Sequence, residues 1–475
     1  MNRGGDIDNL PPEIISEILS RLPVKSLIHF RLVSKSWNAI IIHPHFLKKH
    51  LNQATKLNNL SQKKAILCLS SSSKLFSSPL SSTNSTELIV STNITRTGQI
   101  KFLGSCNGLF CIFIARELFL WNPSTRKSRK LPNPPIPLPI SIHNIFSSFA
   151  VSAFGYDSCI DDYKVMRNVW SGPNRYETLL YSLKKDSWTV IEDNSPYRID
   201  YQVSGIFVKR AFHWLVNHGP YSKHSYAIVS FGLESERYGT LPLPADESLL
   251  IKSIDQKLNI TVLKGWLCLY CNYFRRAFVL WAMKDYGEEN SWATLLKFEY
   301  DNVFSSIFPL RSSYVHVVPK YLFENGEMLV EVKGIRHGRV EVVRYRENEM
   351  PVRVFGGISD LGEIHVYLET LVSPLSKHAS NTLGGGKDHR MGTLGCQLNN
   401  VSRALLNQNP AQSINKRVEA RHSPIGLYSI MGSERVVLHL AVLWVMKDYG
   451  FGKSRTPMLR IEQKDGELLQ NPNLM

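Results

Sequence analysis

Two cysteines separated by two residues are the first candidates for chemistry in this chain. Cys268-Leu-Tyr-Cys271 has the spacing of thiol redox motifs and of half a zinc site. A structural zinc site needs two further ligands, and neither a second cysteine pair nor a nearby histidine pair accompanies this one. The flanking residues are apolar and strand-like, so we expect both cysteines to lie in a buried core.

Three other groupings contain the residue types of a catalytic or binding site. His213, His218 and His224 are close in sequence, but a loop and a strand face account for them without a metal. Asp161-Asp162 has the form of paired carboxylates, although a turn between strands is the simpler interpretation. Residues 384–387, Gly-Gly-Gly-Lys, lack the upstream glycine and the following Ser or Thr of a phosphate-binding loop. With no serine nucleophile elbow, metal-binding helix or dinucleotide loop, the sequence predicts a protein that is not an enzyme and has no cofactor or metal.

Length and composition narrow the class of protein further. A chain of 475 residues exceeds what one hydrophobic core usually serves, so two or more structural units are expected. Hydrophobic residues make up 43%, which argues against global disorder. Seven cysteines without an N-terminal secretory signal indicate reduced thiols, and the longest apolar run, 436–446, is too short to span a bilayer. We therefore expect a protein of the cytoplasm, the nucleus or both, without membrane contact.

The positive charge of the chain is spread out rather than concentrated. Its formal net charge is +16, yet the densest basic patches, 125–130 and 275–276, are short and lie beside predicted strands. A nucleic-acid-binding protein concentrates its excess charge on one face or in one run. The distribution therefore favours acidic protein surfaces or solvent over nucleic acid as the surroundings of these charges.

The first structured element is a short helical segment near the N-terminus. Between residues 10 and 37, apolar side chains recur at helical spacing. Pro11 and Pro12 suit a helix start, and Pro23 ends the first helix. A second helix follows Pro23, and a third carries Trp37 before His43-Pro44. Three such short helices cannot bury this much apolar surface by themselves, so the sequence predicts a permanent partner.

Beyond residue 52 the pattern changes to short strands separated by turns. Five segments repeat one unit, in which a strand, a tight polar turn and a second strand follow an aromatic anchor. The anchors, at steps of 60, 50, 50 and 64 residues, are Trp121, Tyr181, Phe231, Trp281 and Tyr345. Such a period is typical of propeller blades, whereas a β-sandwich has no reason to repeat one hairpin at near-constant spacing. We expect each anchor to pack between neighbouring blades, and a strand near 366–372 to close the ring by pairing with 65–69.

The N-terminal helical segment resembles the F-box. The residues that carry the resemblance, in the same order, are Leu22-Pro23, Lys25-Ser26-Leu27, Phe30-Arg31, Ser34-Lys35 and Trp37. Members of that family dock onto a Skp-type adaptor and through it onto a cullin and a RING protein, and the resemblance implies the same partners here. The residues expected to form or support the adaptor-binding surface are Leu10, Pro11, Ile14, Ile18, Leu19, Leu22, Pro23, Leu27, Phe30, Val33 and Trp37.

The strand-rich part resembles the F-box-associated domain of plant F-box proteins, which include S-locus F-box proteins and F-box proteins of kelch type. Motifs that carry this resemblance are Gly104-Ser-Cys-Asn-Gly-Leu109, Leu120-Trp-Asn-Pro-Ser-Thr125 and Glu369-Thr-Leu-Val-Ser373. The resemblance implies the substrate-recognition subunit of a Skp–cullin–F-box ubiquitin ligase, whose propeller binds a protein to be ubiquitinated and degraded by the proteasome. Two alternatives stay open: a propeller enzyme whose helical N-terminus serves other interactions, and a non-degradative scaffold.

The predicted architecture is therefore mainly β, in three parts. A short α-helical F-box occupies residues 8–52, a β-propeller of about six blades occupies 60–375, and an irregular tail occupies 376–475. Within the tail, Trp444–Gly450 repeats Trp281–Gly287. One partial blade lacks the strands needed to complete a sheet, so we interpret this repeat as part of a largely disordered duplication remnant or gene-model fusion, with a genuine added blade as the alternative.

Loop lengths suggest which face of the propeller binds a substrate. The turns between third and fourth strands are short and charged, whereas the connections that reach the opposite face are longer and rich in Tyr, Trp, His and Arg, the residue types that anchor interfaces. The candidate substrate-binding residues on that face are Trp170, Arg175, Tyr197, Tyr201, His218, Tyr221, His224, Tyr273, Arg275 and Arg276.

Overall fold

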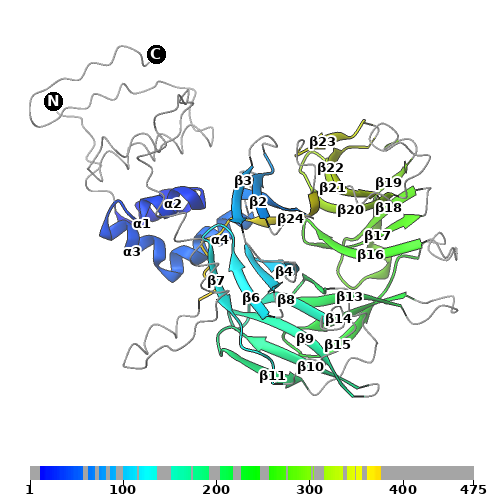
Figure 1. Cartoon of the computed structure of the whole chain (residues 1–475), viewed down its shortest axis with the longest axis horizontal. Helices are drawn as coiled ribbons and strands as arrows, with labels where there is room; N and C mark the ends of the chain where they lie inside the picture. The colour runs from blue at the N-terminus through cyan, green and yellow to red at the C-terminus, as the bar shows by residue number, and fades with distance from the viewer. Residues whose placement is uncertain are drawn as a thin grey trace, which may run out of the picture.

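The computed structural model describes residues 11–375, except for 57–61, 70–73, 82–85, 92–99, 115–116, 136–150, 173–174, 192–203, 218–225, 246–255, 274–276, 301–302, 304–314, 335–339, 348 and 356–360. The chain begins with helices and continues as a ring of sheets, as the sequence predicts (Figure 1). The predicted tail, including Trp444–Gly450, lies outside the described residues.

Four helices make up the N-terminal unit: α1 (Pro12–Ser20), α2 (Val24–Phe30), α3 (Lys35–Ile42) and α4 (Pro44–Lys56). The two predicted proline boundaries are found, because Pro11 precedes α1 and Pro23 precedes α2. The side chain of Ser34 caps α3 by accepting a hydrogen bond from the Trp37 amide at 3.1 Å.

The fourth helix is a difference from the sequence analysis, which places only three helices here. Pro44 begins it in the position where a missing amide proton costs nothing, and Phe46, His50 and Ala54 recur along its buried face. The helices share one core, formed by Leu19, Leu22, Val24, Leu27, Phe30, Trp37, Ile41 and Phe46.

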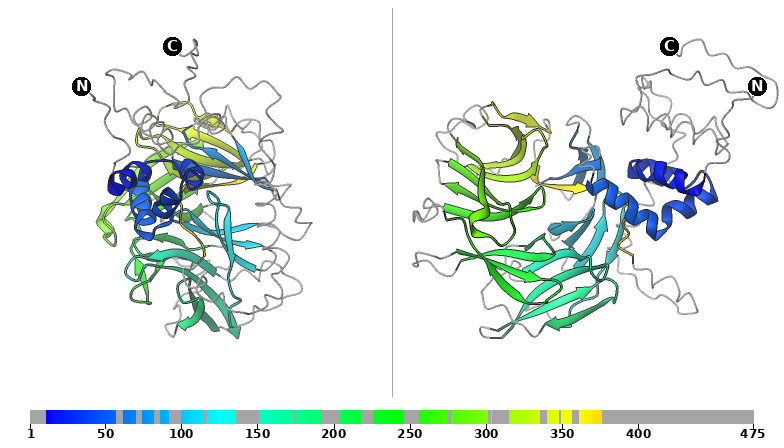
Figure 2. Two further views of the ribbon diagram at one scale, coloured as in Figure 1. Left: turned by 90° about the vertical axis from the view of Figure 1, so that its left-hand side faces the viewer. Right: turned by 180° about the vertical axis from the view of Figure 1, so that it is seen from behind.

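Six four-stranded antiparallel sheets follow and form the six blades of a propeller (Figures 1 and 2). From the inner strand outward, blade 1 contains β24 (Leu361–Leu368), β1 (Lys63–Leu69), β2 (Lys74–Pro79) and β3 (Glu87–Ser91); blade 2 contains β4 (Lys101–Cys106), β5 (Leu109–Ile114), β6 (Glu117–Asn122) and β7 (Lys127–Lys130); blade 3 contains β8 (Val151–Asp157), β9 (Asp162–Gly172), β10 (Arg175–Ser182) and β11 (Ser187–Ile191). Blade 4 contains β12 (Ile206–Val208), β13 (Ala211–Asn217), β14 (Tyr226–Gly232) and β15 (Tyr238–Leu241); blade 5 contains β16 (Gln256–Leu263), β17 (Trp266–Tyr273), β18 (Ala277–Met283) and β19 (Trp292–Glu299); blade 6 contains β20 (Val315–Leu322), β21 (Met328–Gly334), β22 (Val340–Tyr345) and β23 (Val352–Val354). The inner strands contact one another around the centre of the ring.

Ring closure occurs between the two ends of the propeller. β24 pairs antiparallel with β1, and Val366 lies opposite Ala65. The predicted pairing is therefore confirmed, although the strand begins earlier, at Leu361, and ends at Leu368. Residues 369–372 continue beyond it as a strap along one face of the ring.

Blade packing explains why many strands consist of unbroken runs of apolar residues. In β5 every residue is buried, because Phe110 and Ile112 face blade 1 whereas Leu109 and Cys111 face blade 3. Successive residues of this strand face alternate neighbouring blades, so neither side of β5 meets water.

The aromatic anchors pack as predicted. Each is buried and lies in a cluster that joins its own blade to a neighbour; Trp121 packs with Ile66 and Tyr367 of blade 1, and Tyr345 packs with Phe278 and Phe298 of blade 5. Aromatic side chains of this size bury the most area per residue, which suits them to filling the wedge between blades.

Candidate functional site

The predicted adaptor-binding residues divide into a buried group and a surface group. Five of them form the core of the helical unit and support its surface from inside, namely Leu19, Leu22, Leu27, Phe30 and Trp37. Ile18, Pro23 and Val33 are half-buried, Pro11 is exposed, and Leu10 lies outside the described residues. Ile14 is 46% exposed, so a partner can reach this apolar side chain directly.

Two further apolar side chains on this unit are exposed and were missed by the sequence analysis. Leu32, in the turn after α2, is 86% exposed, and Ile42, at the end of α3, is 48% exposed. A large aliphatic side chain left in water at a helix end is a signal of an interface when others lie nearby in the same small unit. The sequence held one clue to this surface: Leu32 is a large aliphatic residue at the variable position x of the F-R-x-V motif.

An ion-pair group fixes α1 against α4. Glu17 lies 2.6 Å from the Lys49 ammonium and 2.8 Å from the Arg21 guanidinium, and it also accepts a hydrogen bond from Gln53. Hydrogen bonding from Lys49, then from Arg21, lowers the pKa of Glu17 to about 2. These contacts hold the helical unit in one arrangement.

The strap formed by residues 369–372 joins the helical unit to the propeller. Leu371 packs into the core of the helices. Just before it, the Thr370 hydroxyl donates to the Asn107 carbonyl at 2.8 Å. The Asn122 amide donates to the carbonyls of Thr370 and Val372, at 3.0 and 2.7 Å.

Three sequence motifs therefore meet at this joint. Asn107 and Gly108 come from the Gly104–Leu109 motif, Asn122 comes from the Leu120–Thr125 motif, and the strap is the third motif. Gly108 has a φ of +78°. A Cβ atom at this position would lie 2.4 Å from the Thr370 hydroxyl and 2.5 Å from the Leu368 carbonyl, so only glycine allows the close approach.

Further contacts place the helices on one particular face of the ring. Lys48 of α4 forms a 2.6 Å ion pair with Asp161 in the turn between β8 and β9. Lys25 of α2 lies 3.8 Å from Glu87 at the start of β3. This face, which we call the turn face, carries the turns between first and second and between third and fourth strands; the helical unit projects from it (Figures 1 and 2).

At the opposite face, which we call the loop face, the second and fourth strands of the blades end and the first and third strands begin. Trp170 lies in β9, and Arg175 begins β10, at that end of blade 3. Tyr273 ends β17 at the same face of blade 5 and packs against the cluster containing Leu258. The remaining candidate substrate-binding residues, Tyr197, Tyr201, His218, Tyr221, His224, Arg275 and Arg276, lie outside the described residues, and the assignment of all ten to substrate stays a prediction.

The groupings first considered for catalysis have structural explanations. Strand β17 directs Cys268 toward blade 6 and Cys271 toward blade 4, so the two thiols do not share a site. Asp161 lies in the turn between β8 and β9, and Asp162 accepts hydrogen bonds from the Ser182 hydroxyl and the Lys184 amide. His213 is buried with its Nε2 atom 2.6 Å from the Tyr286 hydroxyl, and burial lowers its pKa to about 4. Among the described helices, none is long and apolar enough to cross a membrane.

Comparison with known proteins agrees with both parts of the architecture. The family model of the F-box domain matches residues 7–49, and that of the F-box associated beta propeller domain matches residues 61–350. The chain is thus an F-box protein of the propeller class. It belongs to the F-box associated beta propeller family.

Proteins of similar sequence include plant F-box proteins. F-box protein CPR1 of Arabidopsis thaliana is 31% identical over 60% of this chain and 71% of its own length. An Arabidopsis thaliana F-box/kelch-repeat protein, At3g23880, is 26% identical over 77% of this chain and 96% of its own length.

A solved structure, the extracellular domain of the BT4673 one component system of B. thetaiotaomicron, is 10% identical with a TM-score of 0.31. The alignment covers 66% of this chain and about a third, 35%, of that one. A likeness this weak carries no argument about function.

Proposed function

We propose that this protein is the substrate-recognition subunit of a Skp–cullin–F-box ubiquitin ligase. Its F-box would bind a Skp-type adaptor, and through it a cullin and a RING protein, while its propeller binds a target protein for ubiquitination and proteasomal degradation. The observation that carries the proposal is the F-box unit with exposed Ile14, Leu32 and Ile42, fixed to the face of the propeller opposite the loop face.

The fixed joint supports this role on physical grounds. A ubiquitin ligase transfers ubiquitin efficiently when the target is held at a defined place relative to the rest of the complex, because positioning removes translational and rotational freedom from the reaction. Leu371 in the helical core and the Lys48–Asp161 ion pair restrict motion between the two parts. A target bound on the loop face would therefore be presented in one orientation.

The receptor proposal implies that the chain itself catalyses no reaction and acts in the cytoplasm, the nucleus or both. Apolar surface on the F-box favours a protein partner over a role in small-molecule turnover, since buried apolar contacts dominate the centres of protein interfaces.

The proposal is tested by isolating the full chain from plant cells with and without proteasome inhibition. We expect adaptor and cullin to co-purify, and one or more ubiquitinated proteins to accumulate only under inhibition. The matched variant is Ile14→Asp with Leu32→Asp, which alters exposed positions and should lose the adaptor. Absence of adaptor and cullin from the wild-type complex would rule out the receptor role, whereas their presence without any accumulating protein would favour a non-degradative scaffold.

A further inference from the structure

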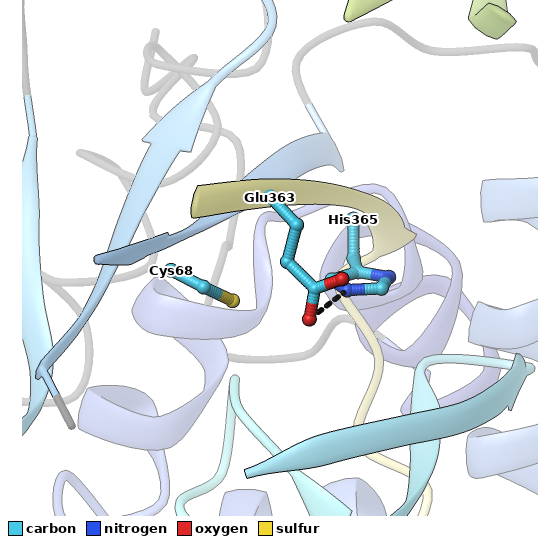
Figure 3. A group of neighbouring side chains, drawn as sticks. All are labelled: Cys68, Glu363 and His365. Atoms are coloured by element: carbon cyan, nitrogen blue, oxygen red, sulfur yellow. Dashed lines mark ion pairs between the residues drawn. The ribbon is translucent and has the colours of Figure 1, made fainter. Parts of the chain in front are cut away.

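A cysteine, a glutamate and a histidine meet at the loop face of blade 1 (Figure 3). Cys68 of β1 lies opposite Glu363 of β24 in the antiparallel register. His365 follows two residues later on the same strand, so all three side chains project from one side of the sheet. One ligand atom from each, the thiol sulfur, a carboxylate oxygen and a ring nitrogen, lies within 4.8 Å of the other two.

The contact between His365 and Glu363 leaves a ring nitrogen of the histidine without a hydrogen bond. Its Nε2 atom is 3.2 Å from Oε1 of Glu363. Beyond this ion-pair contact, the buried nitrogen has no hydrogen-bond partner among the described residues. The ring itself is held by stacking on Phe102 of β4, with ring centroids 4.2 Å apart.

We propose that Cys68, Glu363 and His365 form a binding site for Zn²⁺. A thiolate, an imidazole nitrogen and a carboxylate oxygen are the three ligand types that zinc takes in proteins. The thiol excludes Mg²⁺ and Ca²⁺, which prefer oxygen ligands alone.

The spacing of the ligand atoms agrees with a tetrahedral zinc ion. Bond lengths of about 2.0–2.1 Å to nitrogen and oxygen place those atoms about 3.3 Å apart, close to the 3.2 Å found between His365 and Glu363. A Zn–S bond of about 2.3 Å requires sulfur-to-ligand separations of about 3.6 Å, so small side-chain rotations within the 4.8 Å limit complete the geometry. Glu363 is 40% exposed and His365 24% exposed, so water can supply a fourth ligand.

The surrounding charges permit a divalent cation. Lys101, Lys320 and Lys333 lie near this group; the last two share one counterion, Glu331, at 3.1 and 2.7 Å, which offsets part of their charge, and the Glu363 carboxylate and a Cys68 thiolate would supply two negative charges to the cation. Zinc binds cysteine as its thiolate, so the Cys68 thiol releases its proton when the ion binds.

Zinc at this position would join the two strands that close the ring. Cys68 belongs to β1, the first strand of the propeller in sequence, and Glu363 and His365 belong to β24, the last. A ligand that binds only the folded ring stabilises it by mass action. Bound zinc would thus stabilise the closed ring of the propeller, independently of adaptor binding.

The experiment is a Zn²⁺ titration of the full chain after removal of metal by a chelator, followed by calorimetry and thermal melting. We expect one Zn²⁺ per chain and a rise in melting temperature of a few degrees at saturating metal. Replacing Zn²⁺ with Co²⁺ should give the near-ultraviolet charge-transfer absorption of a sulfur–cobalt bond, a readout that does not depend on stability.

Two variants remove the site, and a third is the control. Cys68→Ser and His365→Gln should each weaken metal binding at least tenfold, and Cys68→Ser should abolish the sulfur–cobalt absorption. The double variant Cys159→Ser with Cys396→Ser removes an exposed turn thiol and the tail thiol and should bind metal as the wild type does. If the wild type shows no sulfur–cobalt absorption, or if the control loses it while Cys68→Ser keeps it, the proposal is wrong. Should Cys68→Ser fail to fold, the Zn²⁺ titration of His365→Gln tests the proposal, and binding as tight as that of the wild type would overturn it.

Discussion

Replacing Asn122 with alanine should weaken the joint between F-box and propeller. The Asn122 side chain is fully buried and donates to the carbonyls of Thr370 and Val372, at 3.0 and 2.7 Å. It also accepts hydrogen bonds from the turn amides of Ser124 and Thr125, at 2.8 and 3.2 Å. Each carbonyl that loses its donor costs about 1–2 kcal/mol, and the turn amides add less because water reaches that turn, so Asn122→Ala should cost about 2–4 kcal/mol of unfolding free energy.

The assay combines thermal melting with hydrogen exchange of residues 369–372 in the full chain. Asn325→Ala is the matched control, because the Asn325 side chain also accepts a turn amide hydrogen bond, at 3.1 Å from the Glu327 nitrogen, but in an exposed turn of blade 6. We expect Asn122→Ala to lower the melting temperature by several degrees and to accelerate exchange in the strap, with little change in Asn325→Ala. Equal effects of the two variants would refute the interpretation of the strap as a structural joint.

Three further predictions concern the same framework. Gly108→Ala should lower the unfolding free energy by several kcal/mol, because strain at positive φ adds to the clash with the strap. The control Gly265→Ala, at a φ of +76° with no atom within 4 Å of the new Cβ, should lower it by only about 1–2 kcal/mol. A similar loss of unfolding free energy in both variants would contradict the clash. Leu371→Ala should lower the unfolding free energy by about 2–3 kcal/mol and increase proteolysis of the helical unit. Leu375→Ala, at an exposed position, should leave the unfolding free energy and the proteolysis unchanged. The pKa of His213 is about 4 in the folded protein against 6.5 ordinarily, so its contribution to stability is present above pH 6.5 and declines as the pH falls toward 4. Between pH 7.5 and 5 the wild type should lose about 2 kcal/mol more than His213→Gln in denaturant unfolding, and parallel pH profiles would contradict this.

Much of the fold was predictable because its signals are local or periodic. Proline boundaries before α1 and α2 and the recurring aromatic anchors each depend on a few neighbouring residues. The pairing of β24 with β1 was also predictable, since a ring needs its last blade completed and only one apolar strand remained near the C-terminal end of the repeats.

The missed features have physical causes. Helix α4 escaped detection because five of its thirteen residues are His or Lys, which obscured the apolar stripe of Phe46 and Ala54. The sequence alone did not separate the two roles within the predicted adaptor-binding set, because only three-dimensional packing shows that Leu22 and Trp37 lie in the core of the helical unit and support its surface from inside.

The joint was beyond sequence reasoning for a different reason. Asn122 and Thr370 are 248 positions apart in the chain, and no local pattern indicates that they form a hydrogen bond. The zinc site escaped for the same reason, because Cys68 and His365 come together only when the ring closes.

The most direct test of the receptor proposal is the affinity of the purified full chain for a Skp-type adaptor, measured by calorimetry. We predict a 1:1 complex that Ile14→Asp with Leu32→Asp weakens at least a hundredfold, with the melting temperature of the propeller unchanged. Arg126→Ala, on the turn face of blade 2, is the control and should bind as the wild type does. No complex with the wild type, or undiminished binding by the double variant, would contradict the proposed role of the F-box.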